Sequence, residues 1–117
     1  MARRSILFSP GDDPSKLRSA PTTDADVVVF DLEDAVVPDA KPSARRTVRD
    51  ALADVTPTDC EVCVRVNPVG CGAAEDVAVA LSAAVPDSVV LPKAGGAPDV
   101  ARLATLLDDA GVDCPLL

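Results

Sequence analysis

Four short apolar runs, each followed by a turn signal, divide the chain into similar blocks. They are Ser5–Phe8, Val27–Phe30, Glu61–Val66 and Ser88–Leu91. Val27–Phe30 contains no polar residue, which is typical of a strand covered on both faces, as in a parallel sheet. Each run leads into Pro, Gly, Asn or Asp residues that favour turns. The four runs are therefore predicted to be strands.

The segments between these strands carry apolar residues at three- and four-residue spacing, which predicts helices. These segments are Pro14–Ala20, Pro42–Val55, Ala73–Ala84 and Pro98–Ala110. Gly111 fits the end of the last helix, and we expect a fifth strand to begin near Asp113. The repeated order of strand and helix predicts an α/β protein with a parallel sheet.

Composition limits the classes of protein that the chain can belong to. With 117 residues it forms at most one domain, and 48% hydrophobic content with only two Phe and no Tyr or Trp predicts a core of Val, Ala and Leu. The net charge of −8 argues against nucleic acid or an anionic membrane as a partner. The Asp-rich, Lys-poor composition indicates a halophilic protein, and the absence of His excludes imidazole chemistry.

The N-terminus carries a twin arginine, Arg3-Arg4, but no signal peptide is expected from it. The apolar stretch that follows ends at Ser9-Pro10-Gly11 and is far shorter than a signal-peptide core. No apolar run approaches the length of a membrane span. We therefore expect a cytoplasmic protein.

Three carboxylates, Asp31, Glu33 and Asp34, follow the most apolar strand. Acids are rarely buried without partners, and the carboxyl ends of parallel strands are where α/β folds bind ligands. Strand alternation would put Asp31 and Glu33 on one face, where they could share a proton or hold a cation. The alternative is that the acids only begin a turn and cap the following helix.

Two basic residues also lie at strand ends. Arg65 sits within the apolar run CVRVN, where its guanidinium needs an anionic partner, either a ligand carboxylate or an internal ion pair with Asp31 or Glu33. The two interpretations are compatible, since a ligand could replace the internal pair. Lys93 closes the fourth strand and could equally be a solvated turn lysine.

The four cysteines, Cys60, Cys63, Cys71 and Cys114, are expected to be structural thiols. Cys60 and Cys63 form a C-x-x-C pair around the start of a strand, where their side chains would face opposite ways and could not hold zinc together. The segment Gly70–Glu75 begins like a dinucleotide-binding fingerprint but has Glu where the third Gly belongs. Neither motif predicts a cofactor.

Four sequence blocks resemble one known family. They are RRSILFSPG at positions 3–11, FDLEDAVxPxAKxxAR at 30–45, VRVNP at 64–68 and VLPK at 90–93. Together they are similar to the citrate lyase beta-subunit family, within the HpcH/HpaI aldolase superfamily. The resemblance implies parallel (β/α) units forming the N-terminal half of a (β/α)8 TIM barrel. It also implies Mg²⁺-dependent carbon–carbon cleavage beside a CoA thioester, of the citryl-CoA or malyl-CoA lyase type.

The resemblance implies a role for several residues of this chain. Arg65 matches the arginine that grips the substrate's carboxylate and carbonyl oxygens, and Glu33 matches a catalytic acid at the mouth of the second strand. Asp31, Glu33 and Asp34 are expected to line the outer shell of the metal. Lys16 is the candidate for contacts to CoA or substrate in the N-terminal block, and Lys93 for support of the site.

The chain also departs from the family pattern. The family's Mg²⁺ ligands, a Glu at the end of the fifth strand and an Asp at the end of the sixth, have no counterpart before Leu117. A closed barrel usually needs about 200 residues or more, so we expect a truncated barrel containing strands one to four and the start of strand five. Exposed strand edges then predict a homo-oligomer or a complementing C-terminal half.

Three classes of function therefore remain. The first is a lyase that is inactive alone, or that a second chain completes, acting on an acyl-CoA substrate. The second is a non-catalytic remnant or interaction module of the same fold. The third is an open binding domain of receiver type, which the length allows. A receiver would place its acids after the first and third strands, whereas here they follow the second.

Overall fold

The computed structural model describes residues 5–55, 60–92 and 97–117. A single sheet contains four strands: β1 (Ile6–Pro10), β2 (Val27–Asp31), β3 (Glu61–Arg65) and β4 (Ser88–Val90). Neighbouring strands are parallel and follow one another in chain order, β1-β2-β3-β4. The predicted α/β class and the parallel sheet are confirmed.

The helices alternate with the strands as the apolar spacing predicted. They are α1 (Pro14–Ser19), α2 (Lys41–Asp54), α3 (Ala73–Ala80) and α4 (Ala97–Asp109), with short 3₁₀ turns η1 (Ala20–Thr22) and η2 (Pro38–Ala40). The predicted end of α3 at Ala84 is wrong. The helix ends at Ala80 because Leu81 leaves helical geometry and Ser82 donates to Val79 in a tighter turn.

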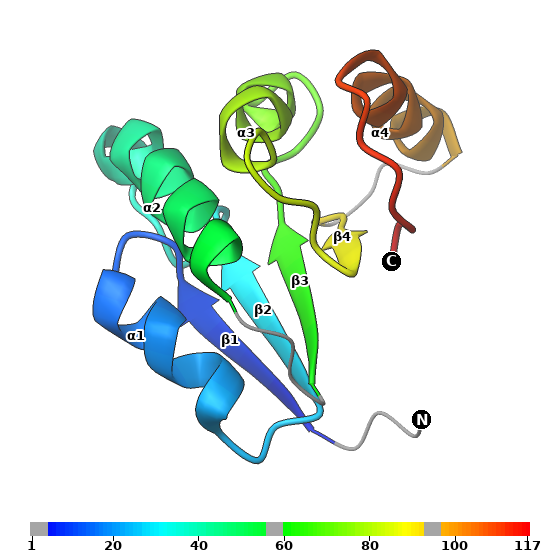
Figure 1. Ribbon diagram of the computed structural model, residues 1–117. Coiled ribbons are helices and arrows are strands. Elements are labelled where there is room, and N and C mark those ends of the chain that lie inside the picture. The colour runs from blue at the N-terminus through cyan, green and yellow to red at the C-terminus, as the bar shows by residue number, and fades with distance from the viewer. Residues whose placement is uncertain (1–4, 56–59, 93–96) are drawn as a thin grey trace.

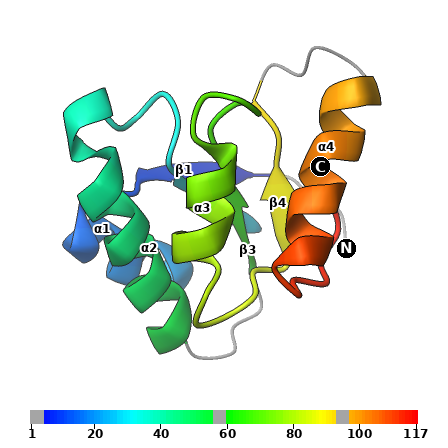
Figure 2. The ribbon, with the colours of Figure 1, turned by 90° about the horizontal axis from the view of Figure 1, so that it is seen from above.

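All four helices lie along one face of the sheet (Figures 1 and 2). Since the strand order never reverses, every crossover returns on the same side, as in a (β/α)8 barrel. A doubly wound sheet such as a receiver needs a reversal that places helices on both faces. Within the described part of the chain, the winding therefore opposes the receiver alternative.

None of the described helices combines the length and apolar character that crossing a membrane requires.

The hydrophobic core fills the space between the sheet and these helices. Val28, Phe30 and Leu32 point into it from β2 and the residue that follows, and each is fully buried. Val48 of α2 and Leu103 of α4 pack against the sheet from the helix side. As predicted, the core is built mainly from Val, Leu and Ala.

The opposite face of the sheet is the side that forms the interior of a barrel. Ile6 and Phe8 of the β1 edge are 56% and 49% exposed there. A shallow cavity of about 190 Å³ lies on this face and is lined by Ile6, Phe8, Val27, Val29, Cys63, Val90 and Leu117. Among the described residues, the face is thus apolar and only partly covered.

The C-terminal residues run beside β4 and pair with it through a single parallel bridge. Leu116 forms a parallel bridge with Val89, and the amide of Leu117 donates to the carbonyl of Val89 at 2.8 Å. The amide of Val89 in turn donates to the carbonyl of Pro115. Among the described residues no further strand follows β4, so the fifth strand expected near Asp113 stays a prediction, and this bridge lies where it would pair.

Gly11 lets the chain turn sharply after β1. Its amide donates to the carbonyl of Asp31 at 2.8 Å, and a Cβ at this position would lie 2.8 Å from that oxygen and 3.0 Å from a Val48 methyl. Only glycine allows this approach without displacing backbone. The contact sets the end of β1 against the end of β2, where the acids lie.

We expect Gly11→Ala to lower the free energy of unfolding by about 1–3 kcal/mol, because the added methyl overpacks against backbone. Urea unfolding measures the change. Ser15→Ala, at an exposed position of α1, is the matched control and should stay within about 0.5 kcal/mol of the parent. Equal stability of Gly11→Ala and the parent would contradict the close approach.

Candidate functional site

An ion pair between Asp31 and Arg65 occupies the carboxyl ends of the two central strands. The two residues are register partners at the ends of β2 and β3. Arg65 Nε donates to Asp31 Oδ1 at 2.9 Å and Nη2 donates to Oδ2 at 2.6 Å. The Asp31 side chain is 2% exposed and that of Arg65 is 21% exposed. The predicted internal pairing of Arg65 is thus with Asp31, in bidentate geometry.

The backbone supports the charge on Asp31 as well. The amide of Glu33 donates to Oδ1 at 2.9 Å and the amide of Ala35 donates to Oδ2 at 3.3 Å. Burial opposes the charge, but the hydrogen bonds from Arg65 and these amides outweigh it and lower the pKa of Asp31. The same pairing raises the pKa of Arg65. Both groups are therefore held in their charged forms.

Phe8 of β1 packs against the guanidinium from the barrel-interior face. The Arg65 guanidinium carbon lies 4.9 Å from the centre of the Phe8 ring, within the range of a cation–π contact. The apolar sequence pattern identified Phe8 only as a strand residue, because stacking on a neighbouring strand depends on the register. Asp31 and Phe8 together orient Arg65 at the strand ends.

The segment Leu32–Val36, which we call the acid loop, carries the other two acids. Because β2 ends at Asp31, the strand alternation expected to place Glu33 beside Asp31 does not extend to it. A hydrogen bond with the Asp34 side chain, then burial and the Asp34 charge, raise the pKa of Glu33, while the Arg65 charge lowers it. Glu33 thus keeps its proton to a higher pH than an ordinary glutamate.

The described residues do not form a magnesium site by themselves. No group of three or more Asp, Glu, His or Cys residues lies close enough to hold a metal ion within the described ranges. The Asp31 carboxylate is already occupied by Arg65 and two amides. An outer-shell role for Asp31, Glu33 and Asp34 stays a prediction.

Of the two lysines predicted to bind substrate, the structure describes only Lys16, and it shows no contact between Lys16 and the Asp31–Arg65 pair. Lys16 lies at an exposed position of α1, where its amide donates to the capping carboxylate of Asp13 at 3.1 Å. Lys93 lies outside the described residues. The C-x-x-C pair does not converge either, since Cys60 packs against the helix-side core and Cys63 faces the barrel interior beside Ser88. No disulfide joins any of the four cysteines, all of which lie within the described residues.

A second polar cluster, which sequence reasoning did not identify, lies between α2, α3 and the end of β3. Lys41 Nζ donates to Asn67 Oδ1 at 2.6 Å, and Asn67 Nδ2 donates to Asp76 Oδ2 at 2.8 Å. Arg45 Nε donates to Asp76 Oδ1 at 2.7 Å. Asp76 is fully buried. Its position, next to Glu75 in the largely apolar stretch AAEDVAVA, was the available sequence signal.

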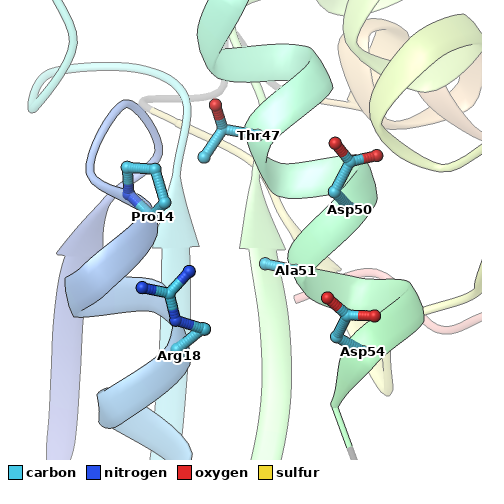
Figure 3. A pocket seen from close by; sticks show the side chains of 6 residues that line it. All are labelled: Pro14, Arg18, Thr47, Asp50, Ala51 and Asp54. Carbon is cyan, nitrogen blue, oxygen red and sulfur yellow. The ribbon is translucent and has the colours of Figure 1, made fainter.

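A cavity of about 200 Å³ lies between α1 and α2, on the outer side of the helices. Its lining residues are Pro14, Arg18, Thr47, Asp50, Ala51 and Asp54. Figure 3 shows Arg18 and Pro14 on α1, with Thr47, Asp50, Ala51 and Asp54 along the facing helix. No residue of the strand ends lines this cavity, so it is separate from the Asp31–Arg65 pair.

A parallel sheet wound in one direction, with charged side chains gathered at the carboxyl ends of its strands, defines part of a barrel-type α/β protein. Residues 4–114 match the HpcH/HpaI aldolase/citrate lyase family model. The chain belongs to this family. The resemblance stated from its sequence motifs is confirmed.

Similar proteins agree with this assignment. The chain is 39% identical over 100 residues to the mitochondrial citramalyl-CoA lyase of Rattus norvegicus, covering 84% of this chain and 30% of that one. It is 36% identical over 108 residues to citrate lyase subunit beta of Leuconostoc mesenteroides subsp. cremoris, covering 92% and 36%.

A solved structure, CitE of Mycobacterium tuberculosis in complex with magnesium, acetoacetate and coenzyme A, is also similar. It superposes with a TM-score of 0.72 at 37% identity, covering 88% of this chain and 38% of that one. The likeness confirms the expected barrel-type fold. The chain spans about a third of the length of these relatives.

Removing one member of the central ion pair tests its contribution to stability. We expect Arg65→Met to lower the free energy of unfolding by about 3 kcal/mol, because it leaves the buried Asp31 carboxylate without its cation. Arg49→Met is the matched control, since Arg49 pairs with the exposed Asp50 and should cost less than about 1 kcal/mol. Urea unfolding measures the stability of both variants. An equal loss of stability in Arg65→Met and Arg49→Met would contradict a special contribution from the Asp31–Arg65 pair.

The pH dependence of stability reports on Asp31 itself. Its folded pKa lies below its unfolded value of about 3.9, so its contribution is complete above about pH 4 and is lost as the pH falls through the folded pKa. We expect the stability advantage of the parent over Asp31→Asn to shrink as the pH falls from 6 to 2.5. Urea unfolding across that range measures it, and a constant difference would show that the carboxylate charge is not stabilised by folding.

Proposed function

We propose that this chain supplies the substrate-gripping part of a Mg²⁺-dependent carbon–carbon lyase that acts on the CoA thioester of a hydroxy acid. The observation that carries the proposal is the bidentate Asp31–Arg65 pair at the strand ends. The similar proteins include citramalyl-CoA lyase and citrate lyase subunit beta, which supports this reaction class. The structure of CitE contains magnesium and coenzyme A, which supports Mg²⁺ and a CoA thioester as the proposed ligands.

In this proposal Arg65 performs the electrostatic part of the reaction. Nε and Nη2 bind the Asp31 carboxylate, which fixes the guanidinium before substrate binds and leaves its other N–H groups, on Nη1 and Nη2, directed away from Asp31 for substrate oxygens. In the cleavage step the substrate hydroxyl gives its proton to the acid–base group, and its oxygen becomes the carbonyl of the keto acid. The electron pair of the broken carbon–carbon bond passes to the enolate of the CoA thioester, so negative charge develops on these oxygens as the reaction proceeds. A preorganised guanidinium stabilises that charge without having to reorient.

Glu33 is the proposed acid–base group. Its raised pKa keeps the proton available at a higher pH than in an ordinary glutamate, which suits a group that gives a proton to an enolate carbon. Lys16 and Lys93 are proposed to contact CoA or substrate. The metal's own ligands lie outside the described residues in this proposal, so no step here depends on them.

We further propose that residues 1–117 form the first four β/α units and the start of the fifth strand of the family barrel. The relatives are about three times as long as the matched segment, so the isolated chain is expected to have little or no lyase activity. The half-exposed apolar face of the sheet favours assembly with itself or with the remaining units. A cytoplasmic location and adaptation to high salt stay predictions.

The test uses a chimera in which residues 4–114 of this chain replace the matching segment of the rat citramalyl-CoA lyase. We expect the folded chimera to cleave citramalyl-CoA with Mg²⁺, while the isolated chain does not. Arg65→Met in the chimera should lower kcat/KM by at least about 100-fold, through lost charge stabilisation. Chromatography of the acyl-CoA products measures cleavage.

Arg46→Met, at an exposed position of α2, is the control variant of the chimera and should leave cleavage unchanged. Full activity of Arg65→Met would remove Arg65 from the proposed mechanism. A folded chimera without activity would favour the alternative, a non-catalytic interaction module. Cleavage by the isolated chain would overturn the expectation that further units are required.

A further inference from the structure

Lys41 begins α2 at a position that does not favour a lysine. The first turn of a helix presents unpaired amides and the positive end of the helix dipole, where acids or capping side chains are preferred. Here η2 runs directly into α2, so the Lys41 amide donates to the Pro38 carbonyl, and the nearest acid in the sequence is Asp39 in η2. The first turn of α2 itself contains no acid, and Ala40 gives no side-chain cap. The Lys41 charge therefore does not stabilise its own helix, and its contacts must explain its position.

The Lys41 ammonium has three N–H donors and three oxygen acceptors around it. Nζ lies 2.9 Å from the carbonyl oxygen of Leu32, 3.0 Å from that of Glu33 and 2.6 Å from Asn67 Oδ1. Two of the three acceptors are thus backbone carbonyls of the acid loop. A charged donor makes these hydrogen bonds stronger than neutral ones.

The acid loop is consequently held from two sides. On one side the amides of Glu33 and Ala35 bind the Asp31 carboxylate, which in turn aligns Arg65. On the other side Lys41 binds the carbonyls of Leu32 and Glu33. Among the described residues, without Lys41 the Leu32 carbonyl would keep only the Asn67 side-chain amide, and the Glu33 carbonyl only the Val36 amide, so the backbone that orients Asp31 would be held more loosely.

A buried network keeps Lys41 in place. Asn67 uses its whole amide group, accepting from Lys41 and donating to the Leu32 carbonyl at 2.9 Å and to Asp76 Oδ2. Asp76 also accepts a hydrogen bond from the backbone N–H of Asn67 at 2.6 Å and another from Arg45 Nε. Gly72 leaves room for this network, since a Cβ there would lie 3.1 Å from Arg45 Nη2 and 3.2 Å from Asn67 Cβ.

We propose that Lys41 is a positioning residue, which clamps the carbonyls of Leu32 and Glu33 and so fixes the acid loop and the Asp31 carboxylate that aligns Arg65. Its importance for catalysis rests on the proposed function. Its effect on the acid loop does not, because the loop's hydrogen bonds exist in the chain as it stands.

The first test is amide hydrogen exchange on Lys41→Met, Lys41→Arg and Arg46→Met. The reporters are the amides of Glu33, Ala35 and Val36, each of which donates within or next to the acid loop. We expect Lys41→Met to speed their exchange at least tenfold while the amides of Val28 and Val64 keep their rates. Lys41→Arg should restore much of the protection, and Arg46→Met should change nothing.

Equal acceleration at Val28 and Val64 would show that Lys41 only stabilises the whole fold, and unchanged exchange would show that it does not hold the loop. Either result overturns the proposal.

The second test places the same variants in the lyase chimera. Lys41→Met is expected to lower kcat at least tenfold with KM changed less than threefold, and Lys41→Arg to recover part of kcat. A Lys41→Met chimera with unchanged kcat contradicts the positioning role. An inactive parent chimera counts against the proposed function alone, and the exchange rates then decide the role of Lys41.

Discussion

The Asp31–Arg65 pair is the constraint on which the rest of this site depends. A guanidinium and a carboxylate that are both largely removed from water must meet in good geometry, because an unpaired buried charge is very costly. The parallel register of β2 and β3 makes that geometry possible by bringing the two residues side by side at the strand ends. Gly11, Phe8 and the amides of the acid loop then surround the pair and leave each charged group little freedom to move.

The one-directional winding of the sheet explains why this pair faces the barrel interior. Helices cover one face, so alternate residues of each strand point to the other, where Phe8, Asp31 and Arg65 are found with the partly exposed apolar side chains. In a closed barrel, that face becomes the packed interior and its carboxyl end becomes the active-site mouth. The same geometry that exposes apolar surface in these units thus places Arg65 at that carboxyl end, where the proposed gripping role needs it.

Sequence reasoning predicted the strands, the helices, the parallel sheet and the pairing of Arg65 with an acid, because these follow from hydrophobic period and from the cost of burying a charge. It left the partner open between Asp31 and Glu33, since that choice depends on the residue at which β2 ends. It did not find the Lys41–Asn67–Asp76–Arg45 network, whose members are up to 35 positions apart and meet only after α2 and α3 pack together. The motif containing Lys41 contributed to the family resemblance without revealing what its ammonium binds.

The most direct measurement of the central ion pair is the side-chain NMR signal of Arg65 Nε–H. The geometry predicts that the hydrogen bond to Asp31 Oδ1 shifts this signal and slows its exchange with solvent. The shifted signal should be lost in Asp31→Asn and should persist in Glu33→Gln. A signal that is insensitive to Asp31→Asn, or one that depends on Glu33 instead, would contradict the assignment of Asp31 as the residue that orients Arg65.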